Sequence, residues 1–347
     1  MEWKFPSTNN GQIKGVADSG IETFRGDGIK ALTRETCQNS LDAKSEDAET
    51  VNVEIKSYYV DSMQIPGYIA YKCMLEKSLR YWNGNSEKAT IFLKEAIKNI
   101  EQNKTVILQI SDTNTCGLSE PYKVGFGSWN TLTKIDGGAT KSGDTQGSFG
   151  IGKNAPYTCS AYRMVFYRTL NQAGERAAQG MSRLLSFQVD EEEFTTGIGY
   201  FGNSNTNGPV EFIPQLEQLS VRDAVGTDIF VYGLNVVNTS DIKTAVYIEI
   251  LDNFLMSIYR NLLLLKFGKD EISSKTLEQY INKYKSKVKD SYSTWLALTQ
   301  PEAEEYKLEF HKLGYLKLKL LVDHSKKLNK KVLVTRVCLK ISMLWSL

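Results

Sequence analysis

The distribution of hydrophobic and polar residues along the chain predicts a mixture of strands and helices. Short apolar or β-branched runs, several of them alternating with polar residues, are typical of strands. They occur at residues 50–59, 104–112, 162–170, 184–190, 226–234, 315–323 and 330–341. Apolar residues recur at helical spacing at residues 28–45, 68–82, 86–102, 239–265 and 273–287, and a further helix is predicted to start at 152. This order predicts an α+β protein, in the form of an α/β sandwich with helices on one face of a sheet.

The pattern also divides the chain into three predicted parts. Residues 1–27 form a polar N-terminal arm, residues 28–234 a first domain, and residues 235–347 a second α/β region that ends on apolar residues, as in a truncated or partner-completed chain. A helical insertion at about residues 60–103 of the first domain is either a docking surface or a simple thickening of the domain. Residues 118–150 are rich in Gly, Ser and Thr, and a loop of that length inside a compact domain is usually functional.

Composition narrows the class of protein. Hydrophobic residues make up 41% of the 347 residues and charged residues 24%, which is ordinary for a globular protein with a core. The 5 cysteines form no CxxC pair, and 2 histidines, His311 and His324, argue against a histidine-rich metal centre. The N-terminus lacks a signal pattern and the longest apolar run, residues 261–267, is too short to span a bilayer. We therefore expect a cytoplasmic protein without membrane contact.

Charge leaves nucleic acid open as a partner. The formal net charge is +2, which neither requires nor excludes DNA, because a basic patch can lie within a balanced total. One basic cluster near the C-terminus is either a contact for DNA phosphates or a solvated turn. Its members are Lys326, Lys327, Lys330, Lys331, Arg336 and Lys340.

The stretch "TRETCQNSLDA", residues 33–43, places polar groups on one side of a predicted helix. Glu35, Asn39 and Asp42 stand at i, i+4 and i+7 and so share a face. Taken alone, this is either a solvated stripe or the floor of a site. An amide oxygen can ligate Mg²⁺, and a nearby carboxylate can orient and deprotonate an attacking water.

Two further motifs follow in the same predicted domain. In "LQISDTNTCGL" a buried strand leads into Asp112, which can accept a hydrogen bond from an exocyclic amine or can simply cap the strand end as an Asx turn. In "GSFGIGKNAPY", residues 147–157, glycines precede a helix, so that backbone N–H groups could approach phosphate oxygens. This glycine loop matches neither the Walker A nor the Rossmann pattern.

Together the three motifs resemble the ATP-binding domain of the GHKL superfamily, which includes the gyrase B subunit, heat-shock chaperones of the ninety-kilodalton class, histidine kinases, MutL and the MORC ATPases. "ETCQNSLDA" is similar to the N box of that superfamily, "DTNTCGL" to its first glycine box and "GSFGIGK" to its second. "VGTDIFVYG" supplies the later threonine, Thr227. The resemblance covers about residues 28–234. Within the superfamily, the chain most resembles MORC-like proteins and bacterial defence-associated GHKL proteins.

The resemblance implies a Bergerat-type fold, ATP and Mg²⁺ as cofactors, and a role for each matched residue. Glu35 would be the general base and Asn39 the metal ligand, while Asp112 would bind adenine directly and through a water held by Thr227. Residues 119–146 would be the ATP lid. The nucleotide-binding residues implied in this way are Asp42, Ala43, Asp112, Asn114, Gly117, Gly147, Ser148, Phe149, Gly150, Ile151, Gly152, Lys153 and Thr227.

One departure from the superfamily pattern affects the base pocket. The first glycine box usually reads Asp-x-Gly-x-Gly, whereas here Asn114 replaces the first glycine and Gly117 comes one residue late. The adenine pocket is therefore expected to have a different shape.

The resemblance also implies a slow ATPase with a nucleotide-gated conformational cycle and an ATP-dependent homodimer. We expect a protein partner and a role in a bacterial DNA-transaction or anti-phage defence system, in which contact with DNA stays open. The alternative is a chaperone-like or scaffolding ATPase that remodels protein partners without contacting DNA. A kinase is not expected, because neither histidine lies in a phosphotransfer helix.

Overall fold

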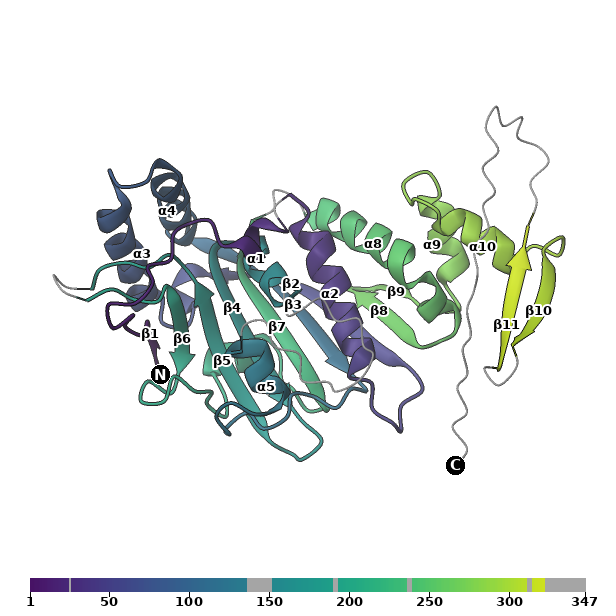
Figure 1. The fold of residues 1–347 in the computed structure, drawn as a ribbon, viewed down its shortest axis with the longest axis horizontal. Helices are drawn as coiled ribbons and strands as arrows, with labels where there is room; N and C mark the ends of the chain where they lie inside the picture. Colours follow the sequence, from purple (N-terminus) through teal and green to yellow (C-terminus); the bar gives the residue numbers. More distant parts are fainter. Residues whose placement is uncertain (25, 136–151, 190–192, 236–238, 311–313, 322–347) are drawn as a thin grey trace.

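A large mixed sheet forms the centre of the protein, as the computed structural model shows for residues 1–24, 26–135, 152–189, 193–235, 239–310 and 314–321 (Figure 1). All neighbouring strands within these residues are antiparallel except β2 and β8, which are parallel. The order across the sheet is β1 (Glu2–Lys4), β6 (Ile198–Gly202), β5 (Arg176–Arg183), β4 (Ser160–Leu170), β7 (Gly226–Leu234), β3 (Lys104–Thr113), β2 (Val51–Asp61), β8 (Leu263–Phe267) and β9 (Asp270–Ile272). The predicted α+β class is confirmed.

Helices cover both faces of this sheet. Successive side chains of a strand point to opposite faces, so Leu108 and Ile110 of β3 pack with one set of helices and Ile107 with another. The first set includes α2 (Gly28–Asp42), α6 (Ala155–Cys159), α8 (Thr239–Tyr259) and α9 (Leu277–Tyr284). The second set is α3 (Tyr68–Trp82), α4 (Glu87–Ile100) and α7 (Pro214–Leu219). The prediction of helices on one face was therefore wrong, because the insertion helices and α7 pack on the other.

The N-terminal residues and those after residue 234 both contribute to this sheet. Trp3 of β1 is 4% exposed and packs in the core with α3 and α4. The short helix α1 (Ser19–Glu22) buries Ile21 against Tyr157 of α6. Beyond residue 234, α8 packs against α2 and leads to β8, beside β2. The sheet thus takes strands from all three predicted parts, while their division into domains stays a prediction.

Several predicted elements are confirmed and some differ. The insertion consists of α3 and α4, separated at residues 83–86 as expected, after a short 3-10 helix, η1 (Ser62–Gln64). Residues 184–190 were predicted to be a strand, but the strand is β5, which ends at Arg183. The buried side chains of Leu184, Leu185 and Phe187 give this segment the apolar pattern of a strand. Its backbone N–H groups donate hydrogen bonds to separate segments and not to one neighbouring strand: Leu184 to Gly197 and Ser186 to Lys14.

The helix predicted for residues 239–265 is shorter in the structure. It ends at Tyr259, and Asn261 has φ +60°, a left-handed conformation that stops a helix. The residues from Leu263 onward then pair with β2 as β8.

The glycine-rich segment also contains a helix that the sequence did not predict. This is α5 (Gly127–Thr133), which buries Trp129 completely against β4 and β5. The description resumes at residue 152 with the 3-10 helix η2 (Gly152–Asn154), which continues into α6.

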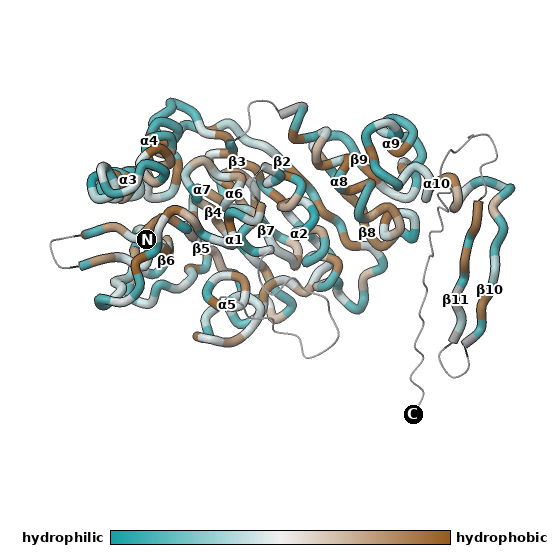
Figure 2. The backbone as a smooth tube through the Cα atoms, turned by 45° about the horizontal axis from the view of Figure 1, so that its top comes forward, coloured by the Kyte–Doolittle hydropathy of each residue, from teal (hydrophilic) through white to brown (hydrophobic). Residues whose placement is uncertain are grey.

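A separate two-stranded hairpin follows α10 (Ser291–Thr299) and lies beyond the end of the large sheet (Figure 1). Its strands are β10 (Glu304–Phe310) and β11 (Gly314–Leu320), and both alternate between hydrophilic and hydrophobic residues (Figure 2). The strand predicted at 330–341 and the basic cluster that includes Lys326 lie outside the described residues. No helix in the described part of the chain is long and apolar enough to cross a membrane.

Candidate functional site

Helix α2 presents a buried stripe to the sheet and a polar stripe beside it. The buried positions Thr33, Thr36, Cys37 and Ser40 follow the i, i+3, i+4, i+7 spacing of a core-facing helix side. Three of these four carry a hydroxyl, which is unusual for a core stripe. A hydroxyl buried in this way needs a hydrogen-bond partner, and for Ser40 that partner is on β3.

The carboxylate of Asp112, near the end of β3, accepts three hydrogen bonds inside the protein. Ser40 Oγ donates to Oδ2 at 2.8 Å. Thr115 Oγ1 and the backbone N–H of Thr227 both donate to Oδ1, each at 2.8 Å. Asp112 is only 8% exposed, and burial raises the pKa of its carboxyl against the opposing effect of these donors and of Arg222. The structure thus brings Asp112, Thr227 and helix α2 together.

This arrangement leaves Asp112 able to accept one more hydrogen bond. Two carboxylate oxygens offer about four lone-pair positions, and the described residues supply two donors to Oδ1 and one to Oδ2. A ligand amine placed at Oδ2 would complete the set. An exocyclic amine such as adenine N6 has the required N–H donor.

Gly226 allows β7 to approach Asp112 closely. A Cβ at this position would overlap the backbone oxygen of Asp112, and the φ of Gly226 is +149°. Glycine is the residue that meets both conditions. The close approach places the N–H of Thr227 within reach of Asp112 Oδ1.

The second predicted cluster joins Glu35 to the end of the glycine loop. Glu35 is partly buried, with a side chain 20% exposed, and its Oε1 lies 3.6 Å from Arg34 Nε. A Cβ on Gly152 of η2 would overlap Glu35 Oε2, so the loop backbone runs directly against this carboxylate. The next residue, Lys153, donates from Nζ to the backbone oxygen of Ile135, just before the undescribed part of the lid. Glu35, Gly152 and Lys153 therefore lie together.

The remaining residues of the N box lie at the surface of α2. Asn39 is exposed, with its side chain one helical turn beyond Glu35. Asp42 is exposed and accepts a hydrogen bond from Gln38 Nε2 at 3.0 Å. Ala43 caps the helix, and its backbone oxygen accepts from the N–H of Cys116 at 2.8 Å.

Asn114 and Gly117 shape the turn after β3 without contacting the Asp112 carboxylate. Asn114 has φ +65° and donates from Nδ2 to the backbone oxygen of Thr50. It lines a different cavity, of about 400 Å³, with Thr50 and Asn261. Gly117 has φ +66° and leaves no room for a Cβ beside the oxygen of Leu170. The displaced glycine therefore serves a tight turn.

Part of the predicted site lies outside the described residues. This applies to Gly147, Ser148, Phe149, Gly150 and Ile151, and to the lid from residue 136 onward. The predicted roles of these residues in holding phosphates stay predictions.

Two contacts of Asp112 were missed in the sequence analysis. Ser40 lies within the N box, and its position on the buried stripe of α2 was the available signal. Thr115 lies three residues after Asp112, which is the spacing at which a hydroxyl can cap a strand-end carboxylate. Between them they supply two of the three donors that hold the carboxylate.

The residues around Glu35 include one potential ligand for a divalent cation. Gly152 has no side chain, and the Glu35 carboxylate occupies the space that a Cβ would take. Asn39 offers an exposed amide oxygen, a ligand type suited to Mg²⁺. Within the described residues no group of three or more His, Cys, Asp or Glu side chains could hold a metal ion, so phosphate and water oxygens would have to supply the other ligands.

The sequence matches no protein-family model and no curated protein. One solved structure that the chain resembles is the ATPase region of Saccharomyces cerevisiae topoisomerase II bound to ICRF-187 (dexrazoxane). The two share 10% sequence identity with a TM-score of 0.42, and the match covers 92% of this chain and 66% of that chain, just under two thirds.

Proposed function

We propose that this chain is a GHKL-type ATPase, which binds ATP with Mg²⁺ and hydrolyses it slowly. The observation that carries the proposal is the buried carboxylate of Asp112, held by Ser40, Thr115 and Thr227 beside the helix that bears Glu35. A buried carboxylate with three donors and room for a fourth is suited to reading an amine. A second carboxylate on the adjacent helix is suited to activating water.

Each residue then has a distinct task in the proposed reaction. Asp112 accepts the N6 hydrogen of adenine, and Thr227 keeps that carboxylate in place through its N–H. Glu35 orients the attacking water and accepts its proton. Asn39 would hold Mg²⁺ through its amide oxygen, and when bound the cation would supply neutralisation of the phosphate charge. The backbone of residues 147–152, with Lys153, would hold the phosphate oxygens.

We further propose that nucleotide drives a conformational and dimerisation cycle in a bacterial DNA-transaction or anti-phage defence system. Two contacts support a link between the nucleotide and the rest of the chain. Gly20 of α1 lies against the side chain of Asn154, so the N-terminal segment contacts η2 at the end of the glycine loop. Lys153 contacts the lid at Ile135. A nucleotide that moves this loop would move both the N-terminal segment and the lid.

The alternative is an ATPase that remodels protein partners without DNA. One observation favours it: the insertion exposes large apolar side chains, with Ile69 of α3 73% exposed and Ile91 of α4 57% exposed. DNA binding that requires ATP and weakens with salt would support the first function. Turnover that is independent of DNA and stimulated by a protein neighbour would support the second.

The deciding experiment measures ATP binding and ATP hydrolysis in parallel for three proteins. Glu35→Ala should bind ATP with nearly wild-type affinity and lose about 10²–10⁴-fold in turnover, as expected for loss of a general base. Asp112→Asn should lose binding, because one oxygen that accepts hydrogen bonds becomes an amide that donates them. Wild-type protein that fails to bind ATP in the presence of Mg²⁺ would refute the proposal.

A matched control separates loss of the base from loss of any surface carboxylate. Glu76 lies on α3, on the other face of the sheet, and pairs only loosely with Lys72 at 3.8 Å. Glu76→Gln should leave both binding and turnover unchanged. Normal turnover in Glu35→Ala would show that the base has been assigned to the wrong residue.

A further inference from the structure

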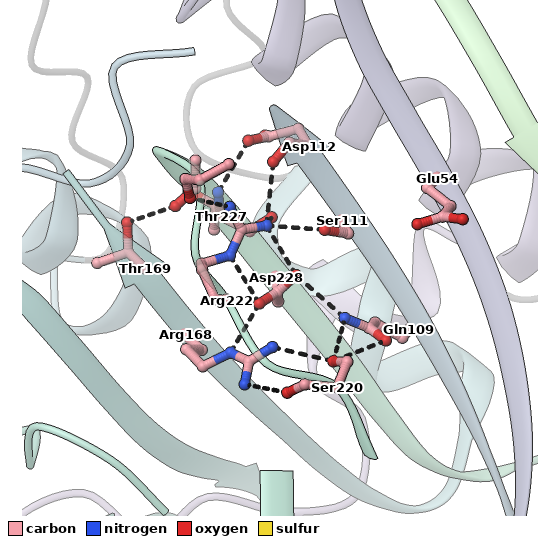
Figure 3. A network of polar contacts seen from close by, with 12 residues as sticks. Glu54, Gln109, Ser111, Asp112, Arg168, Thr169, Ser220, Arg222, Thr227 and Asp228 are labelled. Carbon is pink, nitrogen blue, oxygen red and sulfur yellow. Dashed lines mark hydrogen bonds and ion pairs between the residues drawn. The ribbon is translucent and has the colours of Figure 1, made fainter. Parts of the chain in front are cut away.

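A buried network of charged groups joins Arg168, Arg222 and Asp228 (Figure 3). Asp228 shares a strand face with Phe230, which packs with α3, α4 and α7, so the network lies on the face of the sheet opposite to α2. At its centre is Arg222, from the segment between α7 and β7, with a side chain 3% exposed. Its guanidinium binds both oxygens of Asp228, with Nε to Oδ2 and Nη2 to Oδ1, each at 2.8 Å. Asp228 is in turn bound by Arg168 Nε at 2.7 Å. Asp228 therefore has two cationic partners.

The same guanidinium also binds the backbone of the two residues that form the adenine end of the proposed site. Arg222 Nη2 lies 3.0 Å from the backbone oxygen of Asp112 and 3.0 Å from that of Thr227. It also donates to Ser111 Oγ at 2.7 Å. Because the guanidinium is planar and carries fixed donors, it can hold two carbonyl groups of neighbouring strands in one geometry.

Arg222 binds these two carbonyl groups just beyond the point where β3 and β7 stop pairing. The pairing of β3 with β7 ends at Ser111 and Asp228, one residue before Asp112 and Thr227. Beyond that point two other contacts join the strands: the Asp112 carboxylate with the Thr227 N–H, and Arg222 with the two carbonyl groups. Arg222 thus extends the connection between β3 and β7 where the sheet pairing has stopped.

The rest of the network fixes Arg222 itself. The pKa of Asp228 is subject to burial, which raises it, but the hydrogen bond and charge of Arg222 and the charge of Arg168 lower it to about 2. Asp228 is therefore an anion at neutral pH. Arg168 is held by Glu217 of α7 at 2.8 Å and by the backbone oxygen of Ser220 at 2.7 Å. The guanidinium of Arg222 has little freedom to move away from the strand ends.

We propose that Arg222 is a positioning residue for adenine recognition, which fixes the Asp112 carboxylate from behind the sheet. This inference rests on the proposed ATP-binding function. Arg222 acts through the backbone of Asp112 and Thr227 and contacts no nucleotide. Without it, the two strand ends would separate and the carboxylate would lose its fixed direction. Selectivity for the adenine amine would then fall more than affinity for the rest of the nucleotide.

The test compares ATP with the triphosphate of purine riboside, which lacks only the 6-amino group. Dissociation constants for both are measured with Mg²⁺ for wild-type protein, Arg222→Gln and Arg222→Lys. The wild type should prefer ATP by about tenfold or more, as expected for a hydrogen bond to a charged acceptor. Arg222→Gln should bind the two nucleotides within about twofold of each other, and Arg222→Lys should lie in between, because an ammonium lacks the guanidinium fork.

Arg168→Gln is the matched control, because Arg168 shares Asp228 with Arg222 but, among the described residues, has no hydrogen bond to Asp112 or Thr227. Both glutamine variants should lower the melting temperature, and Arg168→Gln should keep the wild-type preference for ATP. Equal loss of preference in both variants would assign a general structural role to the network and overturn the inference. If Arg222→Gln does not fold, a wild-type preference in Arg222→Lys overturns it as well.

The two levels of the proposal fail in different ways. Wild-type protein that binds no ATP, or binds both nucleotides equally, would refute the proposed adenine site and with it the role of Arg222. A wild-type preference that persists in Arg222→Gln would refute only the role of Arg222.

Discussion

The hydroxyl of Ser40 on α2 donates a 2.8 Å hydrogen bond to Oδ2 of Asp112 on β3. This contact joins the helix that carries Glu35 to the carboxylate assigned to adenine. Ser40 is 1% exposed and Asp112 is 8% exposed, so the bond is shielded from solvent. The two ends of the proposed nucleotide site are therefore connected through one buried side-chain contact.

Ser40→Ala should weaken ATP binding by about tenfold, because the oxygen that faces the ligand loses the donor that orients it. Turnover of bound ATP should change less, since Glu35 is left in place. The measurement is a nucleotide titration together with turnover at saturating ATP.

Ser78→Ala provides a control with the same change in chemistry. Ser78 on α3 is fully buried, and its Oγ has no hydrogen-bond partner within the described residues. This variant should bind ATP like the wild type. Equal loss of affinity in both variants would indicate that Ser40 matters only for packing.

Gly152→Ala should reduce turnover by up to about a hundredfold, because a Cβ at this position would displace the Glu35 carboxylate and small misplacements of reacting groups are costly. ATP affinity should fall less than turnover. Steady-state rates and binding constants together measure the two effects.

The comparison variant is Gly15→Ala. A Cβ at Gly15 would meet no atom within 4 Å, so this substitution adds the same methyl group without a clash. It should keep wild-type turnover. Full activity in Gly152→Ala would mean that the loop and Glu35 do not act together in catalysis.

The sequence was sufficient to predict the local placement of the candidate residues, while their roles stay predictions. Glu35 and Asn39 lie on the predicted helix, α2, and Asp112 lies near the end of the predicted strand, β3. The partners of these residues were harder to predict because they depend on the packing of distant segments. Arg222 binds the backbone of Asp112 across 110 residues of sequence. In addition, a charged residue such as Arg222 or Asp228 is normally expected to be exposed, whereas these two are buried as an ion pair.

In the fold as well, features set by local sequence were predicted better than those set by distant segments. The spacing of apolar residues predicted α3 and α4 correctly, since each helix buries one face. It failed at residues 184–190, where buried side chains occur without a strand. Burial on both sides of a segment gives the same apolar pattern in irregular backbone as in a strand.

Cys37 should be unreactive although it lies on α2 close to Asp112. It is 1% exposed, and burial, together with the nearby charge of Asp112, raises the pKa of its thiol far above the usual range. Iodoacetamide at pH 8 should modify the partly exposed Cys73 and Cys116 first and spare Cys37 in the folded protein. A time course of peptide mapping by mass spectrometry measures the order in which the cysteines are modified.

Alkylation in urea is the control, because every cysteine should then react. Rapid modification of Cys37 in the folded protein, together with loss of ATP binding, would contradict its assignment to the core and place the thiol in the nucleotide site.

Asp228 should make the protein sensitive to acid. The pKa of its carboxyl is lowered from the usual 3.8 to about 2 in the folded protein. A lowered pKa means that the folded state binds fewer protons than the unfolded state between these values. Its contribution to stability is therefore complete above about pH 4 and is lost as pH falls through 2. The shift corresponds to about 2 kcal/mol of unfolding free energy.

Urea unfolding of wild type and Asp228→Asn from pH 7 to pH 2.5 checks this contribution. The variant should be less stable by about 3–5 kcal/mol at pH 7, because Arg168 and Arg222 lose their buried anion. Its stability should then fall less steeply below pH 4, since the titrating group is gone. Asp47→Asn, at an exposed turn residue, should follow the wild-type curve. Parallel acid profiles for wild type and Asp228→Asn would show that this carboxylate is not the anion that holds the two arginines.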